Sequence, residues 1–516
     1  MCIRDRSNIK TLLTAGNDTN QFSANSFASL ANVAVSDGVT LDVSDLVDSI
    51  GQANTATGKS TLAAGATVFS INTGITINGG NEANFESLLT HEGNGLLSVT
   101  NHNLTVGSGT DQNISVANAI SLAATTTGTV TSAIDTTESV DSLKTLYDTG
   151  ETNAYTITIT SDAADTELST AAEFNAINNA TSVAVNATSV TALASSNISD
   201  IKTLLTAGND TNQFTATSFG SLATVAVADS TLDVSDLNDS IAQANTATGA
   251  TSTSFTISSG GTINGGTAAE FTALLGYESG TQISISNQNL TVDSGTMSLA
   301  NAVALSATTS GTVTGEITSS TTISAMLDGS SGLKDTGTKA TQALTITVAS
   351  GDAEATAANL TSLYGKTTVA VDASAVTEIT GSVAEANIVY AAGASEITGL
   401  GNETVVTTDG TLSDVTTLNT LDGNTTGTVN AASVTSITGT LAKLLTAYGS
   451  NGITGLGNET ISVSDTGGGS SLAASDLNSL DSKTSGTITT ATGLVTLTVT
   501  VAALITAYGS EGLTLE

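Results

Sequence analysis

The stretch LVTLTVTVAALITAYG (residues 494–509) contains the two hydrophobic rhythms on which the fold depends. Its first half alternates apolar residues with Thr, and period-2 alternation rich in Val, Leu and Thr predicts a β-strand. In its second half Val501, Leu504, Ile505 and Tyr508 stand at positions i, i+3, i+4 and i+7, which predicts a short helix. A strand and a helix therefore follow each other directly.

The same two rhythms recur along the chain. Ser or Asp stands at the start of many helical stripes and Gly at the end, and these are capping signals. Further helical stripes begin at Phe85, Leu143, Phe271 and Leu441, and further alternating stretches cover residues 155–160, 182–185 and 367–371. The sequence thus predicts a regular succession of short strands and short helices.

Internal repetition occurs at two scales. The segment IKTLLTAGNDTNQF occupies residues 9–22 and returns unchanged at residues 201–214, so a unit of about 190 residues is duplicated. Near the C-terminus the phrase ITGLGNET begins at Ile397 and again at Ile453. Each such period has two similar halves, which gives an elementary repeat of about 28 residues, a length typical of solenoids.

These patterns predict an α/β solenoid of stacked rungs of about 28 residues, each with one short strand and one short helix; an all-β solenoid is the alternative. Residues 1–6 differ in composition from all that follows and are interpreted as a non-native leader. Residues 7–190 form the first repeat copy, residues 191–375 the second, and residues 376–516 carry the shorter period.

The composition excludes several classes of protein. The 516 residues include no Pro and no Trp, and 47 acidic residues against 11 Lys and Arg give a net charge of −36. Nucleic acid is excluded as a partner because phosphate binding requires clustered Lys and Arg. No apolar run is long enough to predict a transmembrane helix.

An acidic cluster is the one candidate site. It lies in LDVSDLxDS and comprises Asp42, Asp45 and Asp48 in the first copy and Asp233, Asp236 and Asp239 in the second. Acids at a helix start cap the helix and complement its dipole, and this is the first interpretation. Calcium is the second, because Ca²⁺ accepts several carboxylate oxygens, and paired-carboxylate catalysis is the third. Any calcium site would be nonstandard, since the chain lacks the known calcium-loop motifs.

Histidine catalysis is excluded by comparing the two copies. His91 and His102 correspond to Tyr277 and Gln288 in the second copy, so the scaffold does not depend on an imidazole. Without a usable Cys or a third His, neither a Ser/His/Asp site nor an ordinary zinc site can be assembled. We therefore expect no enzyme activity and no cofactor other than a possible calcium ion.

The Pro-free, Thr/Ala/Val/Gly-rich units, with phrases such as SVTSITGTLAKLLTAYGS (433–450) and SDLNSLDSKTSGTI (475–488), resemble repeat regions of very large bacterial cell-surface or secreted proteins of the marine cyanobacterial type. The resemblance covers residues 7–516 and transfers no functional residue. It implies an extracellular or cell-surface location and a structural or adhesive role, with surface polysaccharide or neighbouring repeats of the same protein as partners. A carbohydrate-binding or carbohydrate-active solenoid and a phage fibre segment are the alternatives.

Overall fold

The computed structural model describes residues 2–3, 6–16, 27, 29–36, 38, 40–56, 65–107, 113–146, 153–160, 169–333, 342–465, 471–490 and 496–514. The chain forms two compact units: Met1–Ser258 with Gly276–Ser284, and Ser259–Leu275 with Ile285–Glu516. Strands and helices alternate in both units, and the strand pairs within each unit are parallel. The fold is α/β, and the all-β alternative is wrong because α-helices separate the strands.

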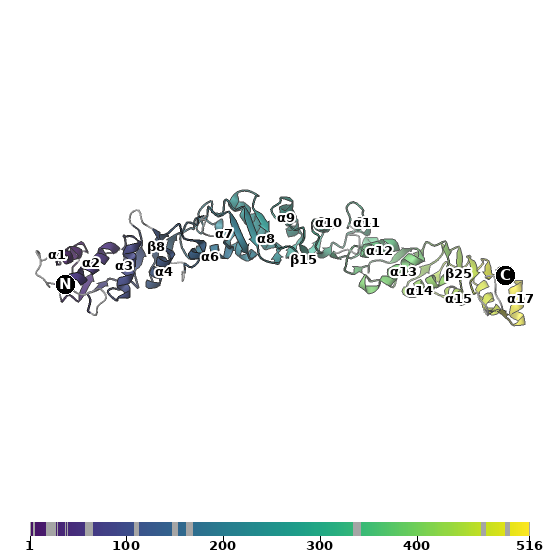
Figure 1. Cartoon of the computed structure of the whole chain (residues 1–516). Coiled ribbons are helices and arrows are strands. Elements are labelled where there is room, and N and C mark those ends of the chain that lie inside the picture. The colour runs from purple at the N-terminus through teal and green to yellow at the C-terminus, as the bar shows by residue number, and fades with distance from the viewer. Residues whose placement is uncertain are drawn as a thin grey trace. The chain divides into compact units, whose positions relative to one another are not determined.

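The helices are short, as the stripes predict. Those of the first unit are α1 (Arg6–Gly16), α2 (Val43–Ala56), α3 (Glu82–Gly93), α4 (Val116–Thr125), α5 (Val140–Leu143), α6 (Ala171–Asn179), α7 (Ile198–Gly208) and α8 (Val234–Thr248). They are followed along the chain by α9 (Ala268–Ser279), α10 (Leu299–Thr308), α11 (Ile323–Met326), α12 (Ala357–Tyr364), α13 (Val383–Ala392), α14 (Val415–Asn424), α15 (Leu441–Gly449), α16 (Ala474–Asp481) and α17 (Val501–Gly509). From α12 to α17 successive helices pack side by side in chain order (Figure 1).

The strands of the first unit form three parallel sheets. Their orders are β1 (Cys2–Ile3), β2 (Asn32–Val35), β4 (Val68–Ile71); β3 (Thr40–Asp42), β5 (Thr76–Asn78), β6 (Asn103–Thr105), β8 (Val130–Ile134), with β7 (Asn113–Ile114) and β9 (Ala154–Thr156) also on β8; and β10 (Ala192–Ser196), β11 (Thr224–Val227), β13 (Ser254–Thr256). Strand β12 (Thr231–Asp233) leads directly into α8.

The second unit contains longer sheet paths. Their orders are β14 (Thr262–Thr267), β15 (Asn289–Met297), β16 (Val313–Ile317), β17 (Ala343–Thr345); β18 (Glu354–Thr356), β20 (Glu378–Gly381), β22 (Thr404–Thr407), β24 (Val429–Asn430), β26 (Ile453–Thr454); β19 (Val371–Asp372), β21 (Ile397–Thr398); β23 (Thr411–Leu412), β25 (Ser436–Gly439), β27 (Thr460–Val463), β29 (Ile488–Thr490), β31 (Leu513–Thr514); and β28 (Ser471–Ala473), β30 (Thr496–Thr498).

The strand register stacks like residues on one another. A coil is defined as the segment of chain that runs from one strand residue to the residue that it faces in the neighbouring strand. Buried aliphatic residues one coil apart form ladders, which are Leu41, Ile77, Leu104 and Val130 in one sheet and Ile379, Val405, Val429 and Ile453 in another. Each coil therefore buries its apolar side chains against the coils on either side.

Coil length is not uniform, in contrast to the predicted constant repeat. Thr40 faces Thr76 in the long coil between β3 and β5, whereas Val405 faces Val429 in the much shorter coil between β22 and β24. All the coils between Glu354 and Thr514 are of the short kind. The difference lies partly in the helices, since α2 and α8 have 14 and 15 residues and α12 and α16 have 8.

Several predicted element ends shift in the structure. Residues 494–501 do not form one strand: β30 covers only Thr496–Thr498, because the hydroxyl of Thr500 accepts a hydrogen bond from the amide of Ala503 and starts α17. Leu494 and Val495 lie outside the described residues. Ser or Asp residues before the stripes are predicted caps: Asp414 does cap α14, whereas Ser199 lies inside the first turn of α7, which begins after Asn197.

Candidate functional site

The duplicated aspartates begin with a helix cap. Asp233 Oδ1 accepts hydrogen bonds from the Ser235 amide at 2.8 Å, the Ser235 hydroxyl at 2.6 Å and the Asp236 amide at 3.4 Å. Asp42 Oδ1 makes the same three contacts with Ser44 and Asp45, at 2.9, 2.6 and 3.3 Å. The first carboxylate of each cluster therefore caps its own helix, which confirms the capping interpretation for Asp42 and Asp233.

The other two aspartates of each cluster bind a lysine from the preceding helix. Lys10 Nζ on α1 lies 3.0 Å from Asp45 Oδ1 and 2.7 Å from Asp48 Oδ2 on α2. The second copy repeats this arrangement between α7 and α8. There Lys202 Nζ is 2.7 Å from Asp236 Oδ1 and 2.8 Å from Asp239 Oδ2. We call these two groups the lysine clamps; sequence reasoning missed their lysines, although both lie in the duplicated IKTLLTAG segment.

The chemistry of the clamps is that of an ion pair. Hydrogen bonds to Asp236 and Asp239 raise the pKa of Lys202, and bonds to Asp48 and Asp45 raise that of Lys10. Both amines therefore stay protonated and are not nucleophiles. The ammonium group also occupies the position between two carboxylates that a cation would take. Across the described residues, no group of three or more His, Cys, Asp or Glu side chains is arranged to hold a metal ion.

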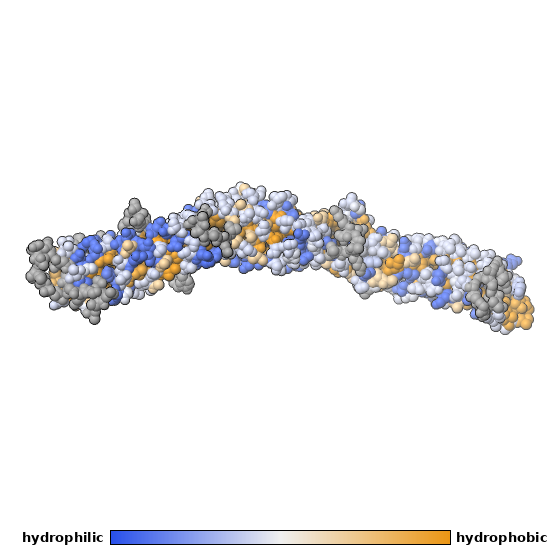
Figure 2. All heavy atoms as spheres, in the orientation of Figure 1, coloured by the Kyte–Doolittle hydropathy of each residue, from blue (hydrophilic) through white to orange (hydrophobic). Residues whose placement is uncertain are grey.

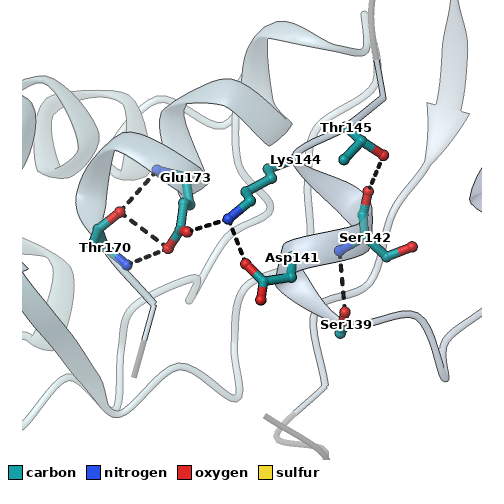
Figure 3. Close-up of polar contacts among 7 residues, drawn as sticks. All are labelled: Ser139, Asp141, Ser142, Lys144, Thr145, Thr170 and Glu173. Atoms are coloured by element: carbon teal, nitrogen blue, oxygen red, sulfur yellow. Dashed lines mark hydrogen bonds and ion pairs between the residues drawn. The ribbon is translucent and has the colours of Figure 1, made fainter. Parts of the chain in front are cut away.

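A third lysine joins two other helices. Lys144, just after α5, donates hydrogen bonds to Asp141 and, at 2.7 Å, to Glu173 on α6 (Figure 3). Glu173 also accepts bonds from the Thr170 amide and hydroxyl, so it completes a capping box while binding the lysine. The carboxylate therefore stabilises its own helix and attaches it to the preceding one.

Carboxylates also cap the helix of the preceding coil. The Val383 amide, at the first residue of α13, donates to Asp409 Oδ2 at 2.6 Å. The Leu441 amide at the start of α15 donates to Asp465 Oδ2 at 2.7 Å. Three further pairs of this kind are Val116 with Glu138, Ile198 with Asp229 and Ile323 with Asp352. We call these the cross-coil caps: each satisfies an amide that a helix leaves without a partner in its own coil.

Asparagine side chains connect successive helices in a similar way. Asn387 Nδ2 donates to the Thr417 carbonyl at 2.9 Å, and Asn419 Nδ2 donates to the Lys443 carbonyl at the same distance. Asn478 Nδ2 reaches the Ala503 carbonyl at 3.0 Å. These contacts are uncharged and use backbone carbonyl groups as acceptors. They therefore attach one helix to the next without requiring a Lys or Arg side chain.

A buried glutamate forms a different contact in the repeat ITGLGNET. Glu459 is fully buried, and its carboxylate accepts the Tyr448 hydroxyl at 2.5 Å and the Gly457 amide at 2.9 Å to both oxygens. Gly457 has φ +141°, a conformation that favours glycine. Burial and the bond to Glu459 raise the pKa of Tyr448, which keeps the phenol protonated as a donor. The carboxylate is therefore held by neutral donors.

The earlier copy of ITGLGNET contains the same contact. Glu403 is 1% exposed and accepts the Tyr390 hydroxyl at 2.9 Å and the Gly401 amide at 3.0 and 2.9 Å. We call both groups tyrosine latches. The sequence signal was present, because Tyr and the Glu of GNET recur together, but sequence reasoning did not connect them.

A shallow trough lies beside His102 in the first unit. It has a volume of about 460 Å³ and is lined by Val68, Phe69, Ser70, Ile71, Thr73, Gly95, Leu97, Ser98, Thr100, Asn101 and His102. His102 is 2% exposed, its Nδ1 is buried without a hydrogen-bond partner, and burial lowers its pKa. His91 lies on α3 with its Nδ1 likewise unpartnered. The trough contains hydroxyl and amide groups and no charged side chain.

No protein-family model matches this sequence, and no curated protein is significantly similar to it. Residue roles therefore come from the geometry of this chain alone. No described helix combines the length and the apolarity needed to cross a membrane.

Proposed function

We propose that the chain is a non-catalytic structural module, an α/β solenoid that belongs to a large bacterial cell-surface or secreted protein. The observation that supports this proposal best is that polar side chains connect each coil to its neighbours. Lysine clamps, cross-coil caps, asparagine contacts and tyrosine latches all attach one coil to the next. Polar side chains that connect coils in this way favour a structural role over a catalytic one.

The acid excess has a physical explanation in this proposal. A carboxylate that accepts backbone amide bonds at a helix start is stabilised by the amides and the helix dipole, so it needs no Lys or Arg. The remaining negative charge keeps the molecule apart from others of its kind. An exposed location with high salt, such as a cell surface, suits this charge because salt screens the self-repulsion.

Small-angle X-ray scattering tests the solenoid. A stacked array grows along one axis, so we expect an asymmetric distance distribution and a radius of gyration above the roughly 24 Å of a compact chain of this length. A symmetric distribution with a radius near that compact value would contradict the proposal. The same data give the mass, and a trimer would favour the phage-fibre alternative.

Binding of a neutral saccharide is a second candidate function, and the trough beside His102 favours it. Its volume lies in the range of small-ligand sites, and its hydroxyls and amide can hydrogen-bond to sugar hydroxyls. Saturation-transfer NMR with a panel of neutral oligosaccharides tests it. Binding that Asn101→Leu abolishes would support the trough as the site, and no transfer from any saccharide would eliminate this candidate.

A further inference from the structure

His102 lies at a junction between neighbouring coils of the first unit. The Ile75 carbonyl, directly before β5, accepts a hydrogen bond from the His102 imidazole and another from the Asn103 amide at 3.1 Å. Thr126, shortly before β8, donates its hydroxyl to the His102 carbonyl at 2.5 Å. Strand β6 begins directly after His102 and pairs with both β5 and β8. The residue therefore contacts the coil on either side of its own.

The same junction position recurs in three later repeats, and each time it holds a buried polar side chain. The four residues are at most 3% exposed and stand directly before a strand: His102, Gln288, Glu403 and Glu459. Threonine hydroxyls donate to the carbonyls of Gln288 and Glu403 at 2.6 and 2.8 Å, as Thr126 does to that of His102. The two glutamates are held by the tyrosine latches. The position therefore requires a side chain whose polar atoms are hydrogen-bonded in the interior.

His102 meets this requirement at only one of its two ring nitrogens. Hydrophilic residues cover much of the visible face of the first unit (Figure 2), whereas the His102 side chain lies beneath the surface. Nδ1 is buried without a hydrogen-bond partner, so the bond to Ile75 comes from Nε2. A proton on Nδ1 would add a positive charge and a donor that has no acceptor in the junction. Burial accordingly lowers the pKa of His102 from the ordinary 6.5.

Among the described residues, the charged group that acts on His102 is Glu92 on α3. It acts to raise the pKa of His102, with less effect than burial has. Its Oε2 atom already accepts the Val99 amide at 2.8 Å. The residues that line the trough and Thr126 are uncharged. Pairing with a protonated His102 would compete with the bond to Val99, so Glu92 compensates the new charge only in part.

We propose that His102 is a pH switch in the first repeat copy: when its imidazole takes up a proton from solvent, the junction between β5 and β6 opens and the trough beside it widens. Water stabilises the protonated ring, so acid favours the state in which His102 is exposed. In that state the Asn103 amide loses the Ile75 carbonyl. The second copy does not respond, because Gln288 at the same position has no proton to gain.

The switch acts at a higher pH than the loss of the carboxylate contacts. A His residue with a folded pKa below 6.5 leaves the junction fully stable above that value and weakens it as the pH falls toward the folded pKa. The ordinary carboxyl pKa values are 3.8 and 4.5, and hydrogen bonds lower those of caps such as Asp233 and Glu385. The caps therefore stay ionised in the upper part of the range in which the junction opens.

Amide hydrogen exchange of the full chain from about pH 7.5 to about pH 5.5 tests the switch. After correction for intrinsic exchange, protection of the Asn103 amide should fall about tenfold, because the open state binds one more proton below pH 6.5. The Asn289 amide of the second copy donates to the Gly261 carbonyl at 2.8 Å and is the internal control, which should keep its protection. Constant protection of Asn103 overturns the proposal, and so does an equal fall at Asn289.

Two variants assign the effect to one ring. His102→Gln follows the second copy and should abolish the pH dependence at Asn103, whereas the matched control His91→Tyr, which also follows the second copy, should leave it unchanged. The control keeps His102 as the only histidine, so NMR of the untagged chain follows its titration even if His102→Gln does not fold. A midpoint below 6.5 supports the proposal. A midpoint at 6.5, or a folded His102→Gln variant with the wild-type pH dependence, overturns it.

Discussion

The N-terminal unit and the stretch from Glu354 to Thr514 attach their coils with different chemistry. The first unit includes the long coil from Thr40 to Thr76, and lysine clamps on exposed helix faces connect its long helices. The C-terminal stretch has short coils, such as that from Val405 to Val429, and uses buried carboxylates held by Tyr and Gly. Cross-coil caps occur in both regions.

The lysine clamps and the tyrosine latches occur in coils of different length, although Lys144 also joins two helices across a short coil. Each lysine clamp joins side chains that are distant in the sequence but lie on two neighbouring helices at the surface, where water can solvate the ions. In two of the shorter coils the segment after the helix carries a buried glutamate. This glutamate reaches the tyrosine of that helix from inside, only 11 or 13 residues later. A buried carboxylate with neutral donors replaces an exposed ion pair.

Acid should destabilise both regions, and this is the largest effect we expect. In the C-terminal stretch the backbone amides of Ser382 and Thr416 donate hydrogen bonds that lower the pKa of Glu385 and of Asp414, respectively. In the first unit burial acts to raise the pKa of Asp233, but hydrogen bonds from Ser235 and from a backbone amide outweigh it and lower that pKa. A lowered folded pKa gives stability that is present above the unfolded value and is lost as the pH falls. Denaturant midpoints should therefore fall steeply below the ordinary carboxyl values of 3.8 and 4.5. A midpoint that stays constant down to about pH 2 would contradict the role given to the carboxylates.

Removing a latch should be the most damaging single substitution. Glu459→Ala leaves the Tyr448 hydroxyl and the Gly457 amide buried without an acceptor, which should cost about 3 kcal/mol of unfolding free energy. Glu459→Gln keeps one carbonyl acceptor and should lose less. Urea denaturation measures both, and equal stability of the alanine variant and the wild type would show that the latch is not a stabilising contact.

Removing a cross-coil cap should have an intermediate effect of similar size in the two regions. Asp465→Ala and Asp229→Ala each leave one helix-start amide without its acceptor, at a cost of about 1–2 kcal/mol. Urea denaturation again measures the loss. A cost confined to one variant would mean that the caps, like the other attachments, differ between the regions.

The lysine clamps should contribute least. Lys202 is 36% exposed, so Lys202→Met should cost about 0.5–1 kcal/mol at low salt and less at high salt. The raised pKa of the lysine means that this contribution is complete below pH 10.5 and is lost as the pH rises through the folded value. A cost that does not change with salt would indicate that the lysine acts through packing instead.

The same variant tests calcium. With its lysine removed, the pair Asp236 and Asp239 is uncompensated, and millimolar Ca²⁺ should raise the melting temperature of Lys202→Met more than that of the wild type. A large calcium-dependent rise in the wild type, reversed by EDTA, would instead favour calcium at the acidic cluster despite the clamps. Circular dichroism measures both.

The sequence predicted what is local and missed what depends on coil length. The stripe at Leu441, Leu444 and Tyr448 correctly predicted α15, and the Asp233 cap follows from residues two and three positions away. Lys202 and Asp236 are far apart in the sequence, so only the register of the coils brings them together. The constant repeat that was predicted from averaged spacings is shorter than this separation and would not have paired them.

The cross-coil caps had a sequence signal that went unread. The segments TVAVAD (224–229), TVVTTD (404–409) and TISVSD (460–465) all end in the capping aspartate two residues after a strand. Their common form indicates a shared position, but not the identity of the amide they bind. That amide belongs to the preceding coil, and the stacking must be known before the pair can be named.

Amide hydrogen exchange at the helix starts tests the central claim most directly, namely that carboxylates of one coil hold the helix of the coil before it. In Asp409→Ala we expect faster exchange at the Val383 amide and no change at Leu441, and in Asp465→Ala we expect the reverse. Unchanged exchange at both amides, or equal acceleration of both in either variant, would contradict the account.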